Sequence, residues 1–240
     1  MCYRYVMQSD ALRVLAERLG IARPLEWRSR YNLAPSADVP VVRASPGADG
    51  LEMVTLRWGL VPAWTREAEP ARAPANARAE SLASRPMFRD AFRRRRCLVP
   101  ASGFYEWQGE GGRRQPYLFR SRDGSPLCFA GVWEAWRDPA GDRVAGTCAI
   151  ITTAPNGTVR PIHDRIPAIL PPEDCPRWLD ARVVEPSELA PLLRPLPDGV
   201  LTVTAVSTWV NSVRHDDPAC LEPARSTDAG GPRAQFTFEL

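Results

Sequence analysis

Short strand-like stretches recur through most of this chain, and they constrain its fold more than any other feature of the sequence. The stretches VPVVRAS (39–45) and LEMVTLRWGLV (51–61) flank the turn-rich PGADG (46–50), which predicts a β-hairpin. Further along, RDGS (122–125) predicts a second hairpin turn. The remaining strand candidates are RCLVPASGFYEW (96–107), QPYLFRS (115–121), LCFAGVWEAW (127–136), TCAIITTA (147–154) and VLTVTAVSTWV (200–210).

A few stretches between these strands have helical patterns instead. SDALRVLAERLG (9–20) has leucines at helical spacing, Ser9 or Asp10 as a candidate N-cap, and a glycine at its end. ESLASRPMFRDAF (80–92) predicts a second helix that breaks or starts afresh at Pro86. Two more helix candidates are DCPRWLDA (174–181) and PSELAPLLRPL (186–196). Strands mixed with short helices predict an α+β fold, namely a β-rich single domain with a barrel-like or multi-sheet core.

The length and composition are typical of one globular core. The chain has 240 residues, of which 44% are hydrophobic and 25% charged. No apolar run reaches about 18 residues, and no basic-then-apolar secretion signal opens the chain, so we expect a cytoplasmic protein without a membrane span. The Pro- and Ala-rich stretch 65–75 predicts an exposed loop. We expect the domain to cover residues 1–222 and residues 223–240 to form a loosely ordered tail.

The cysteines do not form a metal-binding or disulfide pattern. The six of them, at positions 2, 97, 128, 148, 175 and 220, show neither CxxC nor Cys/His ligand spacing. We therefore expect mostly buried thiols, no metal and no cofactor. Cys2 is the exception, because removal of Met1 would make it the first residue, with both a thiol and a free α-amine.

All 31 basic residues are arginine, and the formal net charge is only +3. So weak a net charge steers polyanions weakly, and any nucleic-acid site must be local. Without lysine, only the N-terminus can supply an amine for attack on a carbonyl. The run RRRR (93–96), between a predicted helix and a predicted strand, is expected to be a solvated face.

Four short stretches have the residue types of a reactive site: CYRY (2–5), ANARAES (75–81), FYEW (104–107) and IHDRIP (162–167). Together they resemble the SRAP family, the SOS response-associated peptidase proteins, over roughly residues 1–222. The other stretches that carry the resemblance, in the family's order, are RYNLAPS (30–36), LRWGLVPAW (56–64), CLVPASGFYEW (97–107) and AVSTWVNSV (205–213).

The resemblance implies a protein that shields abasic sites in DNA damage by covalent attachment. Its partner would be single-stranded DNA containing abasic sites, with junctions of single- and double-stranded DNA as one candidate form. It would act as a monomer, in the cytoplasm and associated with the nucleoid when bound to DNA. The family usually has glycine where Tyr3 stands here and often has an aromatic residue where Thr65 stands.

The chemistry of Cys2 fits such an attachment. A ring-opened abasic site carries an aldehyde, which condenses with an amine to give an imine. An α-amine has a pKa of about 7.7–8.0 against about 10.4 for lysine, so more of it is neutral and nucleophilic at pH 7. The Cys2 thiol could then close a five-membered thiazolidine ring, because intramolecular attack is favoured by many orders of magnitude. The sequence thus predicts a stable DNA–protein crosslink, which the resemblance implies is self-reversible.

Three residues are catalytic candidates beside Cys2. Glu106 stands between two aromatic residues, which favours a raised pKa and a role as general acid or base during imine formation. His163 exchanges protons near neutral pH, so it could open the sugar ring and, as the resemblance implies, assist reversal. Asn76 would orient the sugar hydroxyl or the amine.

Seven residues are candidates for binding DNA. Arg4, Arg78 and Arg165 each follow a catalytic candidate by two positions, so strand periodicity places each on its neighbour's face, where it could bind phosphate. Trp64 could stack on a base, which contributes about 1–3 kcal/mol.

The other three DNA candidates rest on weaker grounds. Asn32 is expected near the N-terminal loop, which it would order. Pro40 resembles the family residue beside the displaced strand, and Thr152 is a candidate phosphate contact.

Two other functions remain open on the sequence. Cys2, His163 and Glu106 could belong to a thiol peptidase or an autoprotease that removes Met1. Alternatively, the protein could be a non-covalent reader of single-stranded or modified DNA in which Cys2 has no role.

Overall fold

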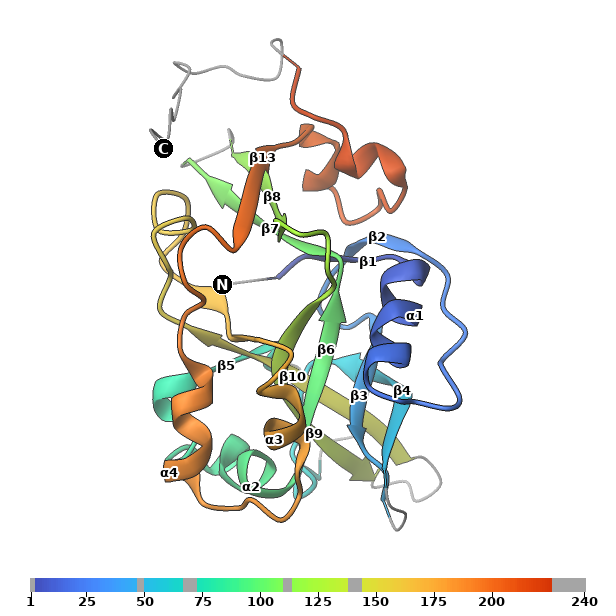
Figure 1. Ribbon diagram of the computed structural model, residues 1–240, viewed down its shortest axis with the longest axis vertical. Helices are drawn as coiled ribbons and strands as arrows, with labels where there is room; N and C mark the ends of the chain where they lie inside the picture. The colour runs from blue at the N-terminus through green and yellow to red at the C-terminus, as the bar shows by residue number, and fades with distance from the viewer. Residues whose placement is uncertain (1–2, 47–49, 67–72, 110–113, 138–143, 226–240) are drawn as a thin grey trace.

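Two β-sheets and a few short helices form the fold of this protein (Figure 1). The computed structural model describes residues 3–46, 50–66, 73–109, 114–137 and 144–225. Within these ranges, no helix combines the length and the apolar character that a membrane crossing requires.

The larger sheet closes on itself as a five-stranded barrel. Its strands pair in the order β10-β4-β3-β6-β9, and an additional β9–β10 pairing completes the ring. The barrel strands are β3 (Asp38–Ala44), β4 (Leu51–Trp58), β6 (Arg96–Ala101), β9 (Leu127–Arg137) and β10 (Val144–Thr153). Three short strands attach to its rim: β5 (Asn76–Arg78) and β11 (Ile166–Pro167) pair with β10, and β12 (Ile169–Leu170) pairs with β9. The predicted β-rich α+β fold with a barrel-like core is confirmed.

The smaller sheet contains the N-terminal strand. Its order is β13-β8-β7-β1-β2, so β1 lies between β2 and β7. The strands are β1 (Tyr5–Met7), β2 (Arg30–Leu33), β7 (Gly103–Gln108), β8 (Gln115–Ser121) and β13 (Leu201–Ala205). This arrangement holds the start of the chain beside the FYEW stretch of β7.

The helices begin close to where the sequence predicts them. They are α1 (Ser9–Arg18), α2 (Pro86–Arg94), α3 (Cys175–Leu179) and α4 (Pro186–Leu189), with 3₁₀ turns η1 (Ala79–Ser81), η2 (Ala190–Leu193), η3 (Thr208–Asn211) and η4 (Pro218–Leu221). The fresh start at Pro86 is confirmed, since proline fits the first helical turn. The predicted cap of α1 is wrong: Gln8 is the N-cap residue without a side-chain cap bond, and the Ser9 hydroxyl donates to Asp10.

Three strand predictions need correction. RCLVPASGFYEW is not one strand but two, β6 and β7, in different sheets. The chain changes sheet at Gly103, where a Cβ atom would lie 2.7 Å from the Phe119 carbonyl oxygen. The RDGS turn is not a hairpin turn, because it joins β8 to β9 of the other sheet. In VLTVTAVSTWV the strand ends at Ala205, and η3 follows.

The expectation of a fully solvated arginine run is wrong for Arg96. This side chain is 5% exposed, and its burial lowers its pKa to about 10. Its guanidinium donates to five backbone carbonyls, those of Phe92, Arg93, Trp178, Asp180 and Val183. Arg96 thereby joins the end of α2 to α3, which the sequence pattern did not indicate.

Aromatic side chains fill the space between the two sheets. Tyr5 of β1 packs edge-on against Trp58 and Phe129 of the barrel, with ring centroids 5.4 and 6.0 Å apart. On β7 and β8, Phe104 and Phe119 stack at 4.9 Å. The five described cysteines are buried free thiols, as expected.

The opposite face of the smaller sheet has a second, smaller core. It consists of buried Val6, Tyr105, Leu118, Val206, Val210 and Cys220. Half of these residues come from the segment 206–222, which follows β13 and contains η3 and η4. We call this segment the C-terminal clasp. The smaller sheet therefore has an inner face toward the barrel and an outer face beneath the clasp.

Candidate active site

Glu106 and His163 meet in the folded protein, although they are far apart in the sequence. Glu106 lies on β7 and is 2% exposed, whereas His163 lies in the turn that precedes β11. Glu106 Oε2 is 3.7 Å from His163 Nε2. This distance is longer than that of a direct hydrogen bond. A proton would therefore pass between the two side chains after they move slightly closer, or through a water molecule or substrate group that bridges them.

The two side chains have shifted proton affinities. Burial raises the pKa of Glu106 to about 8, because desolvation disfavours the carboxylate. Burial also lowers the pKa of His163 below its ordinary value. At pH 7 the carboxyl is therefore mostly protonated and the imidazole mostly neutral. Glu106 holds a transferable proton, and His163 can accept one.

Backbone contacts orient the imidazole of His163. The Arg165 N–H group lies 2.9 Å from His163 Nδ1, and the Arg165 carbonyl oxygen lies 3.2 Å from the same nitrogen. Asp164 Oδ1 lies 3.1 Å from the same Nδ1 on a side chain that is 87% exposed. The turn thus presents Nε2 to Glu106, which is the arrangement that proton exchange between them requires.

The end of β10 brings two of the predicted stretches together. Thr152 pairs with Arg78 of β5 on one side and with Pro167 of β11 on the other. Asn76 is half-buried opposite Ile150, and the Arg78 side chain is exposed. The ANARAES and IHDRIP stretches therefore flank the same strand end.

Arg165 has an ionic partner within the protein. Its guanidinium makes a bidentate pair with Glu80 at 2.7 and 2.9 Å and donates to the Thr152 carbonyl at 2.7 Å. Its side chain is 14% exposed, whereas that of Glu80 is 56% exposed. A phosphate would reach Arg165 by displacing Glu80. Arg165 was predicted from the sequence as a DNA contact, whereas its partner Glu80, which belongs to the ANARAES stretch, was not predicted as part of the site.

The N-terminal strand is directed toward Glu106. Tyr5 pairs with Phe104 of β7, and the Tyr105 N–H group donates to the Arg4 carbonyl at 3.0 Å. Continuing this antiparallel register places Tyr3 opposite Glu106. Tyr3 is 41% exposed. Cys2 itself lies outside the described residues.

Arg4 and Asn32 contact each other. The Arg4 guanidinium donates to Asn32 Oδ1 at 2.8 Å and lies 5.6 Å from the centroid of the Trp107 ring. Burial lowers the pKa of Arg4. Asn32 is 3% exposed, and Trp107 Nε1 donates to Asn211 Oδ1 at 2.7 Å. The Arg4 side chain therefore lies on the face of the smaller sheet that the clasp covers.

The other DNA candidates differ in accessibility. Trp64 is 65% exposed, so its ring is open to stacking. Thr152 is fully buried, and Pro40 is buried in β3 opposite Thr55. Neither of these two side chains is accessible to DNA in this structure.

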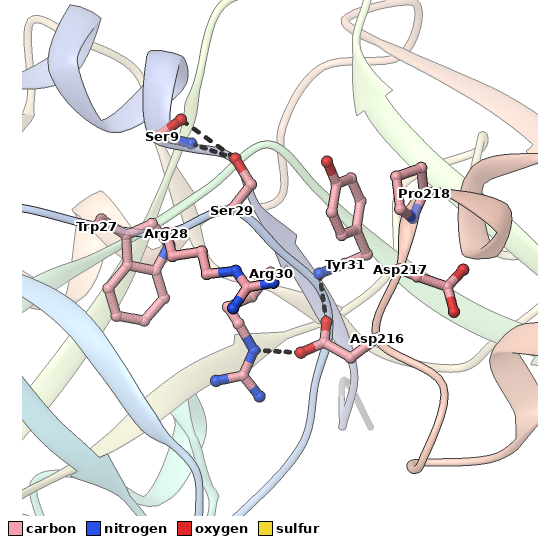
Figure 2. Close-up of a pocket in the computed structure, with 9 residues that line it drawn as sticks. All are labelled: Ser9, Trp27, Arg28, Ser29, Arg30, Tyr31, Asp216, Asp217 and Pro218. Carbon is pink, nitrogen blue, oxygen red and sulfur yellow. Dashed lines mark hydrogen bonds and ion pairs between the residues drawn. The ribbon is translucent and has the colours of Figure 1, made fainter.

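A cavity of the structure lies elsewhere in the fold. Its volume is about 850 Å³, and Figure 2 shows its nine lining residues. They are Ser9, Trp27, Arg28, Ser29, Arg30, Tyr31, Asp216, Asp217 and Pro218, none of which is a catalytic candidate. Arg30 and Asp216 form an ion pair across this cavity (Figure 2). Glu106 and His163, whose shifted pKa values are typical of groups that transfer protons, do not line this cavity.

Comparison with known proteins gives a consistent result. The model of the SOS response associated peptidase (SRAP) family matches residues 1–213. The abasic site processing protein YoqW of Bacillus subtilis is 34% identical, covering 92% of this chain and 99% of that protein. The abasic site processing protein HMCES of Gallus gallus is 33% identical, covering 93% of this chain and 78% of that protein.

A solved structure shares the fold. A crystal structure of a Bacteroides thetaiotaomicron protein superposes with a TM-score of 0.80 at 27% identity, covering 93% of this chain and all of the other. The order of the stretches, the barrel and the family match agree with one another. This chain belongs to the SRAP family.

Proposed function

We propose that this protein processes abasic sites in DNA by capturing the sugar aldehyde with the α-amine and thiol of Cys2, after removal of Met1. The observation that carries the proposal is the buried Glu106, which has a pKa of about 8 and faces His163. Glu106 lies on β7, the strand that pairs with β1. Relatives that span nearly the whole chain are named abasic site processing proteins, which supports the same substrate.

The covalent steps balance without a further reactant. The α-amine attacks the C1′ aldehyde to give a carbinolamine, and Glu106 protonates the departing hydroxyl, which leaves as water. The Cys2 thiol adds to the carbon of the resulting protonated imine, and the thiol proton returns to the Glu106 carboxylate. Aldehyde, amine and thiol thus become a thiazolidine and one water molecule. No electrons are gained or lost.

His163 suits the proton transfers that open and close the sugar ring. It is neutral at pH 7 because burial lowers its pKa, and its Nε2 faces the Glu106 carboxyl. A neutral imidazole can take the proton of the C1′ hydroxyl, and the protonated form can return it. The same exchange run backwards would reverse the crosslink.

The surface around the site offers contacts for a single strand. Arg78 is exposed at the end of β5 and could bind phosphate, and exposed Trp64 could stack on a base. Arg165 would join them once phosphate replaces Glu80. We expect the protein to bind as a monomer inside the cell.

A thiol peptidase is the main alternative, and the family's description favours it. The five described cysteines are buried and cannot attack a substrate, so Cys2 would be the nucleophile there as well. Crosslinking and peptide cleavage would therefore use the same nucleophile, and their products distinguish them.

Incubation with an oligonucleotide that carries one abasic site tests the proposal. The expected result is a heat-stable, slower-migrating band on a denaturing gel. Cys2→Ala or a retained N-terminal extension should abolish the band, and a tetrahydrofuran analogue without an aldehyde should give none. A peptidase would cleave a peptide without forming the band, and a non-covalent reader would shift only native gels.

A further inference from the structure

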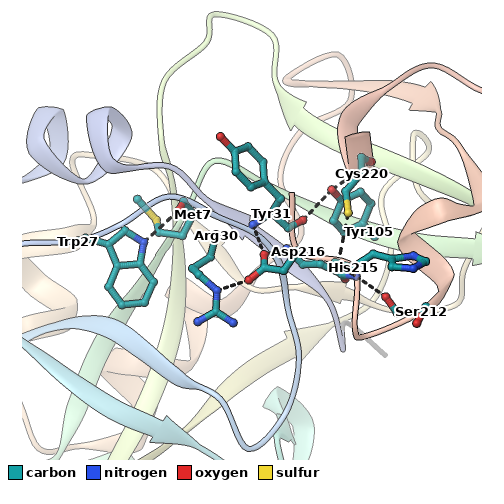
Figure 3. Close-up of polar contacts among 10 residues, drawn as sticks. Met7, Trp27, Arg30, Tyr31, Tyr105, Ser212, His215, Asp216 and Cys220 are labelled. Atoms are coloured by element: carbon teal, nitrogen blue, oxygen red, sulfur yellow. Dashed lines mark hydrogen bonds and ion pairs between the residues drawn. The ribbon is translucent and has the colours of Figure 1, made fainter. Parts of the chain in front are cut away.

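The free edge of β2 is covered by a single carboxylate. β2 pairs only with β1 among the described strands, so the backbone N–H groups on its other side need acceptors. Asp216 Oδ1 accepts from Tyr31 N at 2.6 Å and from Asn32 N at 2.9 Å, and Asp216 Oδ2 pairs with Arg30 Nε. Figure 3 shows Asp216 reaching from the clasp to Arg30 and Tyr31. One side chain thus docks the clasp on the edge strand.

Asn32, once its backbone is fixed, contacts the clasp through its side chain. Its amide nitrogen donates to the carbonyls of Val210, Ser212 and His215 at 3.1, 2.9 and 2.7 Å. Its Oδ1 faces the other way and accepts from Arg4 at 2.8 Å. Because the amide is planar and buried, its donors and its acceptor are set together. Docking of the clasp therefore fixes where Asn32 offers its oxygen to Arg4.

Arg4 connects this contact to the start of the chain. Its guanidinium also donates to the carbonyls of Val210 and Asn211 at 3.0 and 3.3 Å. Arg4 directly precedes β1 and stands two positions after Cys2. On the same outer face, the Tyr105 hydroxyl donates to the Tyr31 carbonyl at 2.9 Å, one residue before Glu106.

We propose that Asp216 is a positioning residue for the N-terminal nucleophile. It holds the clasp against β2, so that Asn32 and Arg4 fix the point from which the chain runs toward Glu106. This proposal rests on the proposed function, since it assigns Asp216 a role in that reaction. Asp216 lies beyond the residues 1–213 that the family model matches.

A positioning role predicts a particular kinetic effect. Asp216 itself touches neither Glu106 nor His163 among the described contacts, so its loss should leave their proton affinities in place. A displaced nucleophile would instead react more slowly once DNA is bound, and a shift of about 1 Å can cost on the order of a hundredfold. The rate at saturating DNA should fall while affinity for DNA does not.

The test compares three variants of the full chain. Asp216→Ala removes all three contacts to β2, and Asp216→Asn retains an oxygen that can accept from both N–H groups. Asp217→Ala is the matched control, because the hydrogen bonds described for the Asp217 side chain are to Trp209 and Ala219 of the clasp itself. Single-turnover crosslinking is measured at saturating abasic oligonucleotide, affinity with the tetrahydrofuran oligonucleotide, and hydrogen exchange at residues 4–7.

We expect Asp216→Ala to crosslink about tenfold more slowly or worse at saturation, with affinity within about twofold and faster exchange at residues 4–7. Asp216→Asn should recover most of the rate, and Asp217→Ala should crosslink at the wild-type rate. A wild-type rate for Asp216→Ala, or equal slowing by Asp217→Ala, would overturn the positioning role. Absence of any adduct from the wild-type protein would instead refute the proposed function, and the exchange result would still report on the clasp.

Discussion

The two faces of the smaller sheet both bury polar groups, but they use them differently. On the outer face, Asp216 accepts three hydrogen bonds, and the side chain of Asn32 makes four. On the inner face, burial raises the pKa of Glu106 to about 8, and its nearest described ionisable partner, His163, lies 3.7 Å away. The hydrogen bonds of the outer face fix geometry, and the desolvated carboxyl of the inner face keeps a proton ready for transfer.

Neighbouring residues of one strand thus serve different purposes. Tyr105 and Glu106 are adjacent on β7, and strand geometry sends their side chains to opposite faces. Tyr105 bonds backbone carbonyls beneath the clasp, and Glu106 faces the candidate active site. We therefore expect substitutions on the outer face to change the free energy of unfolding and the position of the N-terminal strand. Substitutions on the inner face should change the rate of the crosslinking reaction.

The largest expected effect comes from Glu106→Gln. The amide keeps the size of the side chain but cannot donate the carboxyl proton, so the crosslinking rate at saturation should fall by about 10²–10⁴-fold. Glu134→Gln is the matched control, because Glu134 is also buried but pairs with Arg95 on the barrel. Single-turnover gels measure both rates. An equal loss in the two variants would mean that Glu106 has no special role.

The pH dependence of stability should change in the same variant. The folded-state pKa of Glu106 is raised to about 8 from its ordinary 4.5, so the folded state binds the proton more tightly. Its stabilising contribution is therefore complete below the unfolded pKa and is lost as the pH rises toward 8, by at most about 1.4 kcal/mol per pH unit.

Glu106→Gln cannot lose this proton, so its stability relative to wild type should rise over that range. Urea denaturation of both proteins at a series of pH values measures the difference. A constant difference across the range would contradict the raised pKa.

On the outer face, Asn32→Leu should lower the free energy of unfolding by about 1–3 kcal/mol. The substitution leaves the Arg4 guanidinium without its Asn32 acceptor and removes the donors to three clasp carbonyls. Urea denaturation at pH 7 measures the change. Retention of wild-type stability would show that the clasp is held mainly by its apolar core.

The smallest expected effect concerns Glu80. Glu80→Gln should raise affinity for single-stranded DNA by a few fold, because Arg165 would no longer be neutralised by a carboxylate. Glu188→Gln is the charge-matched control, since Glu188 pairs with Arg177 on α3. Fluorescence anisotropy at fixed salt measures both. Weaker binding by Glu80→Gln would show that Glu80 orients Arg165 for phosphate rather than competing with it.

Local patterns in the sequence predicted much of this molecule. Helix starts such as Pro86 and the strands of the barrel follow from local residue preferences. The raised pKa of Glu106 was predicted from its aromatic neighbours, and its physical cause proves to be burial. His163 was singled out from its stretch because the ordinary pKa of histidine is near neutral, and the structure shows that burial lowers the pKa of this histidine.

The rest depends on contacts between distant segments. Gly103 divides one predicted strand into two because the Phe119 carbonyl approaches it from β8. Arg96 is buried against carbonyls from α2 and α3, and Asp216 is half-buried and bonded to an edge strand that is distant in the sequence. Asp216 belongs to a stretch, RHDDP, that looks like an ordinary loop, so no local signal could have singled it out.

Mass spectrometry of the adduct tests the central claim most directly. The protein is reacted with abasic DNA, the DNA and protein are digested, and the modified peptide is sequenced. We predict a peptide that begins at residue 2 and carries the sugar remnant on both the nitrogen and the sulfur of Cys2, with one water lost. A remnant on any other residue, or a modified peptide that still begins with Met1, would contradict the account.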